Sequence, residues 1–181
     1  MKKIKVILGS SREGRNGKMV ADWFMKQTDS YKSSLDFELL DLKDWAIPFF
    51  DNPVSPAMGG EPTGVAKDWA AKIAEADGII VVTPEYNHGY PAVLKNALDV
   101  IYKEWNYKPV SFVSYGAVSG GIRAVEQLKQ VTLELKMYPM HEEVNIHFVW
   151  QAFDEEGVPK DPSLEQKAQA LLKTMSDYLS A

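Results

Sequence analysis

Short apolar segments recur along the chain and predict β-strands. Four of them are rich in apolar and β-branched residues without clean alternation, which is typical of parallel strands buried on both faces: residues 4–8, 37–42, 78–83 and 109–115. A fifth segment, 143–149, alternates apolar and polar residues and therefore predicts a strand at a wetter edge of the sheet.

Between these segments the apolar residues repeat at helical spacing. The helical patterns run from Val20 to Phe24, Val65 to Ile73, Ile122 to Thr132 and Leu164 to Leu179. The last is preceded by Asp161-Pro162-Ser163, which combines a capping side chain with a proline suited to a first helical turn. Strands alternating with helices predict an α/β fold, with a parallel sheet, right-handed crossovers and helices on both faces.

Length and composition narrow the class of protein. The 181 residues predict one domain over 1–181, and the 45% hydrophobic content is enough for a packed core. A net charge of −5 argues against nucleic-acid binding, and the absence of cysteine excludes thiolate nucleophiles, cysteine-based zinc sites and iron–sulfur clusters. Without a signal peptide or an apolar run near the ~20 residues of a membrane span, we expect a soluble cytoplasmic protein.

The region from Pro48 to Pro62 predicts one long irregular loop, because it holds four prolines and the pair Gly59-Gly60. Loops of this length are either functional, as lids or partner contacts, or mobile. The sequence leaves both interpretations open.

The segment after the first strand, Gly9–Gly17, favours an anion site at the start of a helix. Glycines allow close backbone approach, and serine hydroxyls with free N–H groups donate to oxyanions. Arg12 and Arg15 add positive charge. The segment matches neither Gly-x-Gly-x-x-Gly nor a Walker loop, so a monophosphate fits better than a pyrophosphate. A plain helix-capping loop with solvated arginines remains the alternative.

The segments after the third and fourth strands favour a flat heteroaromatic ligand. Thr83–Pro91 places tyrosines, an asparagine and a histidine between two prolines, where amides and rings could match the rim of an isoalloxazine. Ser114–Gly121 is rich in small residues that let a ring lie against the backbone. The alternatives are a rigid turn with packed tyrosines and an ordinary flexible connection. Together, the three segments predict a pocket for flavin mononucleotide (FMN), because ligands of open parallel sheets bind at the carboxyl ends of the strands.

In these motifs the chain resembles the NAD(P)H-dependent FMN reductases, which include quinone, azo-dye and chromate reductases. The resemblance covers about residues 4–135, and Pro84-Glu85-Tyr86-Asn87 followed by Leu94-Lys95-Asn96-Ala97-Leu98-Asp99 is its most specific part. It implies a three-layer flavodoxin-like fold with a five-stranded parallel sheet in the order 2-1-3-4-5. It also implies bound FMN, NADPH or NADH as donor, and a homodimer that can pair into a homotetramer.

The resemblance further implies three groups of FMN-binding residues. The phosphate would be held by Ser10, Arg12, Asn16 and Gly17. The edge of the isoalloxazine would be lined by Pro84, Glu85, Tyr86 and Asn87. The other side of the ring would be approached by Tyr115, Gly116, Ser119 and Gly120. Of the two arginines in the first loop, either Arg12 or Arg15 could grip the phosphate.

The expected chemistry needs no catalytic side chain, since a flavin carries it. We expect a two-electron, ping-pong transfer of hydride from the nicotinamide through FMN to quinones, azo compounds or similar small acceptors. His88 could donate a proton, but a positional or solvent-facing role is favoured. Tyr102, Trp105 and Tyr107 fit either a dimer contact, the pocket mouth or the core. Two other functions stay open: a flavodoxin-type electron carrier and a flavin-dependent redox-sensing interaction protein.

Overall fold

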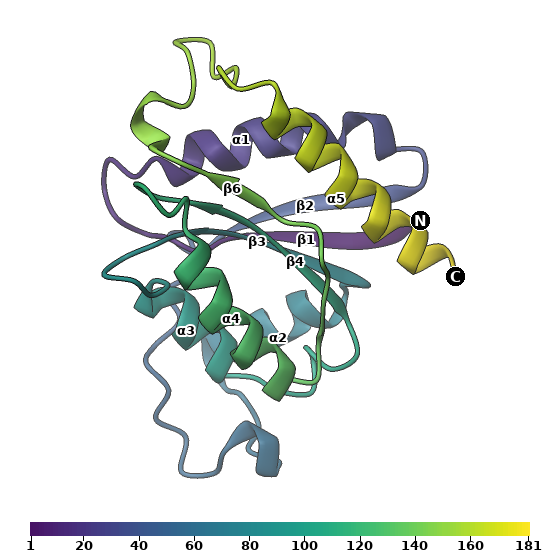
Figure 1. Cartoon of the computed structure of the whole chain (residues 1–181). Coiled ribbons are helices and arrows are strands. Elements are labelled where there is room, and N and C mark those ends of the chain that lie inside the picture. Colours follow the sequence, from purple (N-terminus) through teal and green to yellow (C-terminus); the bar gives the residue numbers. More distant parts are fainter.

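A parallel sheet forms the centre of the fold, with strands in the order β2-β1-β3-β4-β5 (Figure 1). The computed structural model describes residues 1–181. The strands that make the sheet are β1 (Lys2–Leu8), β2 (Leu35–Asp41), β3 (Gly78–Pro84), β4 (Pro109–Tyr115), β5 (Tyr138–Pro139) and β6 (Val144–Ile146). Every strand pair is parallel, so the strand order expected from the resemblance is confirmed.

The fifth position of the sheet holds two short strands, so the sheet has six strands and not the expected five. Strand β5 pairs with the beginning of β4, and β6 pairs with its end. The strand predicted over 143–149 shrinks to three residues because the chain turns at Phe148, whose φ of 45° is left-handed and ends an extended strand.

Helices cover both faces of the sheet (Figure 1). One face carries α1 (Gly17–Gln27) and α5 (Ser163–Ser180), and the other carries α2 (Gly64–Ala74), α3 (Ala92–Asp99) and α4 (Ile122–Glu134). The buried residues accordingly form two apolar clusters of similar size, one on each side of the sheet. No helix is long and apolar enough to cross a bilayer.

The predicted helical stripes are confirmed in α1 and α5 and shifted in α2 and α4. In α2 the buried face is Ala66, Trp69, Ala70 and Ile73, whereas Val65 in the first turn faces solvent. In α4 the first residue, Ile122, is likewise exposed, while Val125, Leu128 and Thr132 are buried as expected.

The long loop is tied to the body of the protein near its start. The Asn96 side chain of α3 donates to the carbonyl of Pro48 at 2.9 Å and accepts from the N–H of Phe50 at 3.0 Å. Farther along, a 3-10 turn spans Pro56–Met58, and Asn52 donates to the Glu61 carbonyl at 3.0 Å. The loop is therefore anchored at its root and cross-linked at its tip.

Candidate functional site

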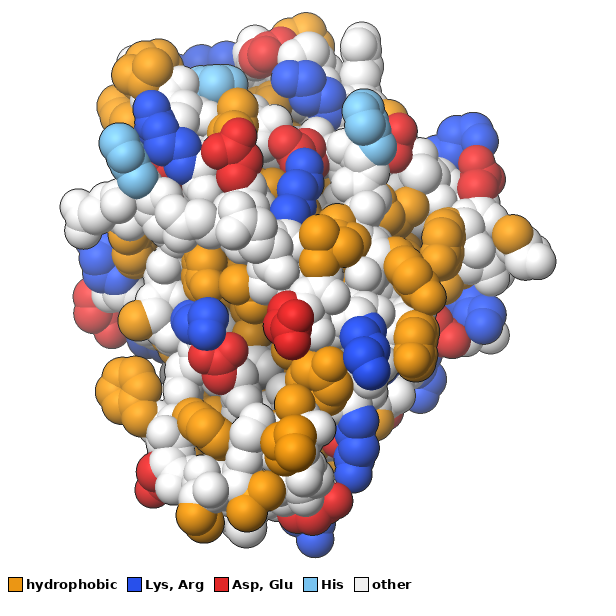
Figure 2. Space-filling view, turned by 60° about the horizontal axis from the view of Figure 1, so that its bottom comes forward, with side chains coloured by type: hydrophobic (Ala, Val, Ile, Leu, Met, Phe, Trp, Pro, Cys, Tyr) orange, Lys and Arg blue, Asp and Glu red, His pale blue; other side chains and the backbone are white.

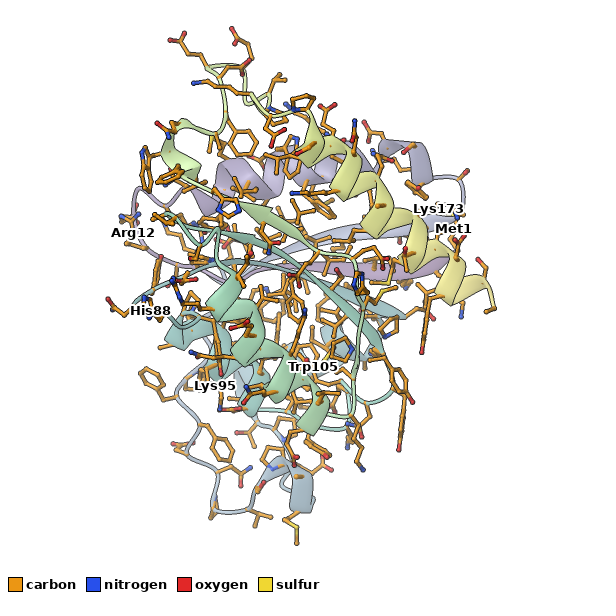
Figure 3. The ribbon with its side chains drawn as sticks, viewed as in Figure 1. Met1, Arg12, His88, Lys95, Trp105 and Lys173 are labelled. Atoms are coloured by element: carbon orange, nitrogen blue, oxygen red, sulfur yellow. The ribbon has the colours of Figure 1, made fainter.

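Three loops meet at the carboxyl edge of the sheet. We call this region the three-loop edge and define it by residues 9–16, 85–91 and 116–121. The parallel register aligns Leu8 with Val82 and Pro84 with Tyr115, so the loops leave the sheet side by side. Figure 3 shows Arg12 and His88 together at this edge, while Lys173 lies at the opposite edge.

The first loop presents an uninterrupted run of free backbone donors. No N–H group from Ser10 to Met19 donates to a protein acceptor, and Val20 is the first residue of α1 that does, bonding to the Asn16 carbonyl at 3.1 Å. The run thus combines the unpaired amides of a loop with those of a helix start, which together form an anion-binding cradle. This arrangement favours the phosphate interpretation over a plain capping loop, since Asn16 makes no side-chain cap.

Gly17 lies at the narrowest point of this loop. A Cβ atom there would collide with the Tyr115 hydroxyl and with Ser10 Oγ. The Ser10 side chain is fully buried, and its hydroxyl lies 3.2 Å from that of Tyr115. Burial raises the pKa of Tyr115 to about 12, which keeps this hydrogen-bonded pair neutral. Ser10 and Tyr115 therefore support the loop from below, with both side chains turned away from its surface.

The two arginines of the first loop have different partners. The Arg15 guanidinium forms a two-pronged ion pair with the Asp41 carboxylate at the end of β2 and also donates to the Ser10 carbonyl. Only 9% of the Arg15 side chain is exposed, so this arginine braces the loop. Arg12 is exposed and donates only to the carbonyls of Glu13 and Gly14. Arg12 is thus the arginine that is free to meet a ligand.

The second loop is a tight two-residue turn. Tyr86 and Gly89 exchange both backbone hydrogen bonds, at 2.8 and 2.9 Å, and the two residues between them have positive φ: 50° at Asn87 and 68° at His88. This is the pattern of a type I′ turn. The turn leaves the N–H groups of Asn87 and His88 and the Asn87 amide free, and the Gln127 side chain fixes it by donating to the His88 carbonyl at 2.9 Å.

Glu85 connects the second loop to the third. Its carboxylate accepts from the Ser119 hydroxyl at 2.7 Å and from the Arg123 guanidinium at 2.9 Å, and its backbone N–H donates to the Tyr115 carbonyl. Burial raises the pKa of Glu85, but the hydrogen bonds from Ser119 and Arg123 outweigh it and hold the pKa below the ordinary value. Glu85 is therefore ionised and structural in this arrangement.

The third loop is held in place by contacts with Ser114 and His147. Gly120 and Gly121 have φ of 62° and 89°, and the Ser114 hydroxyl donates to the Gly120 carbonyl at 2.8 Å. His147 lies against Gly120 and is 2.6 Å from the Val118 carbonyl through Nδ1. The N–H groups of residues 117–119 have no protein acceptor, so they are available to a ligand.

Tyr102, Trp105 and Tyr107, which the sequence left between a dimer contact, the pocket mouth and the core, lie in different surroundings. Trp105 is a core residue, fully buried, with Nε1 donating to the Leu98 carbonyl at 3.1 Å. Tyr102 is half-buried under the Lys136 ammonium, and Tyr107 is exposed beside Tyr138. None of the three belongs to the three-loop edge.

A cavity of about 400 Å³ adjoins the second loop. Phe49 of the long loop and Tyr90 form its apolar part, and Lys95, Asp99 and Gln127 supply polar groups. Phe49 is 79% exposed, so the cavity is open and its apolar wall is unpartnered. Such a mixed lining suits small organic molecules.

Several contacts of the site carry no local sequence signal. Arg123 and Gln127 hold the second loop from α4, Asp41 holds Arg15 from β2, and Asn96 holds the long loop from α3. Each joins residues that lie 26 or more positions apart in the chain. The spacing within a short motif cannot reveal such pairs, because only the fold brings them together.

The geometry fits a ligand with an anionic tail and a flat polar-edged head. Free amides and Arg12 provide for the tail at the first loop, and the free amides of the second and third loops provide donors for the head. Most residues expected for FMN lie in these loops, whereas Gly17 begins α1, and Pro84 and Tyr115 end β3 and β4. Ser10 and Tyr115 support the first loop through buried side chains.

Comparison with known proteins gives consistent matches. A family model described as NADPH-dependent FMN reductase matches residues 2–151. An NAD(P)H-dependent FMN reductase of Schizosaccharomyces pombe is 47% identical over 137 residues, covering 75% of this chain and 68% of that protein. An NAD(P)H:quinone oxidoreductase of Solanum tuberosum is 26% identical and covers 94% of this chain and 89% of its own. The structure of the flavoenzyme NAD(P)H:(acceptor) oxidoreductase FerB from Paracoccus denitrificans superposes with a TM-score of 0.77 at 22% identity, covering 99% and 98% of the two chains.

Proposed function

The chain belongs to the NADPH-dependent FMN reductase family, and we propose that its three-loop edge is where it holds FMN. It is an NAD(P)H-dependent FMN reductase that reduces small acceptors such as quinones and azo compounds. When bound, FMN supplies the redox chemistry by taking a hydride from the nicotinamide and passing two electrons to the acceptor. The observation that carries the assignment is the run of unpaired amides from Ser10 to Met19.

In this proposal the first loop binds the phosphate of FMN. The amides of the loop and of the α1 start donate to the phosphate oxygens, and exposed Arg12 adds a charged contact. The Asn16 side chain, which has no protein partner, is a further donor. Gly17 keeps the loop close to Tyr115, and buried Ser10 holds it in shape.

The second and third loops hold the ring of FMN by its edge. The left-handed pair Asn87 and His88 directs free N–H groups outward from the turn, and Tyr86, 37% exposed, provides an aromatic surface beside it. The free amides of residues 117–119 provide donors from the third loop, which supports its role on the other side of the ring. Pro84 and Glu85 act through the backbone and through the contact with Ser119.

This chain contributes to the reaction by positioning. Fixed backbone donors need no reorganisation when negative charge develops on the ring, which favours the reduced state. His88 is exposed and makes no side-chain hydrogen bond, as a solvent-facing residue would be. Water can therefore supply the protons. In this proposal the nicotinamide donor and the electron acceptor use the open side of the same edge in turn.

The acceptor uses the cavity beside the second loop. Phe49 and Tyr90 offer apolar and aromatic surface to a planar organic molecule, and the cavity volume of about 400 Å³ is in the range of small-molecule sites. The anchoring of Phe50 by Asn96 at 3.0 Å keeps Phe49 at the rim. The long loop thus supports the functional interpretation of 48–62 rather than simple mobility.

We also assign the loop surface to self-association into a homodimer. Four apolar side chains of the long loop are exposed, namely Phe49, Phe50, Val54 and Met58, and Figure 2 shows hydrophobic side chains gathered on the face that carries this loop. Exposed apolar groups of this kind mark interaction surfaces. Sedimentation of the purified protein tests the homodimer and its pairing into a tetramer. The expected cytoplasmic location stays a prediction.

One experiment tests the function as a whole. The purified protein should be yellow with bound FMN, and it should oxidise NADPH or NADH when a soluble quinone is added, without a partner reductase. The ratio of the two donors' kcat/KM gives the donor preference. A yellow protein that fails to oxidise either nucleotide would favour a flavodoxin-type carrier or a redox-sensing protein. A colourless protein that binds no added FMN would refute the assignment of the three-loop edge.

A further inference from the structure

A second cavity, of about 420 Å³, lies outside the three-loop edge. It is bounded by the segment that follows β6 and by the first turns of α5, which lie next to each other in Figure 1. Strand β6 pairs with β4 on one side and with no strand on the other, so the cavity lies along a free sheet edge. Neither the FMN site nor the acceptor cavity includes any of its lining residues.

The cavity has a positively charged end. Lys160 and Lys167 line it, both are exposed, and neither makes an ion pair. The acidic residue of the lining, Asp161, accepts hydrogen bonds from the N–H and the hydroxyl of Ser163 at 2.9 and 2.8 Å. Two lysines against one aspartate leave the lining with a net positive charge, whereas the whole chain carries −5, and this local excess suits an anion.

The other end of the cavity suits a flat heteroaromatic group. Phe148 provides a ring surface and is held there by a left-handed φ of 45° and by its N–H, which donates to the Ala117 carbonyl at 2.9 Å. The Gln151 amide has no protein partner. Asn145 uses its amide nitrogen for Ser114 at 3.0 Å and leaves its carbonyl oxygen free. A free carbonyl and a free amide match the donors and acceptors at the edge of a nucleobase.

The cavity is physically linked to the third loop of the FMN site. His147 lines the cavity and at the same time packs against Gly120 and contacts the Val118 carbonyl. A molecule in the cavity would therefore lie directly behind the loop that we assign to the FMN ring. The cavity and the three-loop edge thus border the same loop, which makes an extended dinucleotide one of two candidate occupants.

We propose that this cavity binds an adenine nucleotide phosphate, with the phosphate between Lys160 and Lys167 and the base on Phe148. The same chemistry has two sources: the adenosine phosphate end of the nicotinamide dinucleotide donor, or a free adenine nucleotide. Only the first source rests on the proposed reductase function.

Titration of the FMN-loaded protein with AMP tests the site, because FMN blocks the phosphate cradle of the first loop. We expect saturable AMP binding by calorimetry, weakened at least tenfold in the double variant Lys160→Gln/Lys167→Gln. Adenosine and ribose 5-phosphate should each bind more weakly than AMP. Phe148→Gly should weaken the binding of AMP and leave the binding of ribose 5-phosphate unchanged. Lys173→Gln is the matched control, since Lys173 lies on the same helix at the opposite edge (Figure 3) and should leave AMP binding unchanged.

Steady-state kinetics separates the two sources. If the dinucleotide uses the cavity, the double variant should raise the KM for NADPH at least fivefold with kcat unchanged, and AMP should compete with NADPH. Weakened AMP binding with an unchanged KM supports the site and assigns it to a free nucleotide. No AMP binding to the wild type, or equal AMP binding in the double variant, would overturn the proposal. A wild-type protein without FMN or NAD(P)H oxidation would instead refute the reductase assignment, while AMP binding would still report on this cavity.

Discussion

The Arg123 guanidinium donates to the Glu85 carboxylate at 2.9 Å, which joins the turn after β3 to the first turn of α4. The Glu85 side chain is only 8% exposed, whereas that of Arg123 is 46% exposed, so the carboxylate is shielded from solvent and the guanidinium lies at the surface. Ser119 adds a hydrogen bond from the third loop to the same carboxylate. One carboxylate thereby sets the distance between the two loops that we assign to the FMN ring.

We expect Glu85→Gln to weaken FMN binding by about tenfold, which corresponds to about 1.4 kcal/mol. The amide keeps the shape of the side chain but loses the charge that Arg123 and Ser119 meet, so the two loops are held less firmly. Titration of apo-protein with FMN, followed by quenching of flavin fluorescence, measures the change. Glu126→Gln, at an exposed position of α4, the helix that carries Arg123, is the control. Equal affinities of Glu85→Gln and wild type would contradict the role of this pair.

The two arginines of the first loop should differ in what their removal changes. Arg12→Ala should weaken FMN binding by about tenfold and leave the melting temperature of the apo-protein unchanged, because its guanidinium contacts only exposed carbonyls. Arg15→Ala should lower the free energy of unfolding by about 2 kcal/mol, because it leaves the Asp41 carboxylate without its charged partner.

Urea unfolding of the two apo-variants and FMN titration of the folded proteins separate these effects. The Ser10→Ala/Arg12→Ala double variant should likewise lower FMN affinity more than the turnover of the filled enzyme. If Arg15→Ala lost only FMN affinity and kept its stability, the assignment of Arg12 as the ligand-facing arginine would be reversed.

His88→Gly should leave kcat with a quinone unchanged between pH 6 and pH 8. The side chain is exposed, and the position needs a residue that tolerates a φ of 68°, as glycine does. Relief of the left-handed conformation should raise stability by about 0.5 kcal/mol after the entropic disadvantage of glycine is subtracted. A fall in kcat with loss of its pH dependence would instead identify His88 as a proton donor.

Stability should decrease in acid through the charge cluster around Lys5. The hydrogen bonds from Lys5 hold the pKa of Glu38 and of Glu75 below the ordinary 4.5, and these bonds outweigh burial and raise the pKa of Lys5 above 10.5. A carboxyl with a lowered pKa binds fewer protons when folded, so its contribution is present above pH 4.5 and is lost as pH falls through the folded pKa. The Lys5 contribution is present below pH 10.5 and is lost as pH rises through its folded pKa.

Urea unfolding at intervals from pH 7 to pH 3 measures this loss. Lys5→Met removes the donor and should flatten the dependence of the free energy of unfolding on pH between pH 5 and pH 3. Lys2→Met, in the same strand, removes the partner of Asp77 and is the control for a more exposed ion pair. An unchanged slope in Lys5→Met would show that other carboxyl groups dominate acid unfolding.

The sequence predicted the elements whose signal is local. Buried strands such as 78–83 and stripes such as Leu164–Leu172 are visible as apolar periodicity, and the Pro84–Asn87 turn is visible as a motif. The early end of β6 was not predictable, because a left-handed Phe148 has no sequence signature comparable to a glycine. The different roles of Arg12 and Arg15 depend on Asp41, which lies 26 residues from Arg15 in the sequence. The pairing of β2 with β1 in the parallel sheet brings Asp41 next to Arg15.

The Asn96 amide holds the long loop at Pro48 and Phe50, and the Lys103 ammonium, 3.2 Å from the Glu61 carboxylate, holds its far end. Residues 51–60, between these two anchors, line no part of the acceptor cavity. Substitutions between the two anchors, at Val54 or Met58 for example, should therefore alter the surface assigned to self-association and leave the shape of the flavin turn and of the acceptor cavity unchanged.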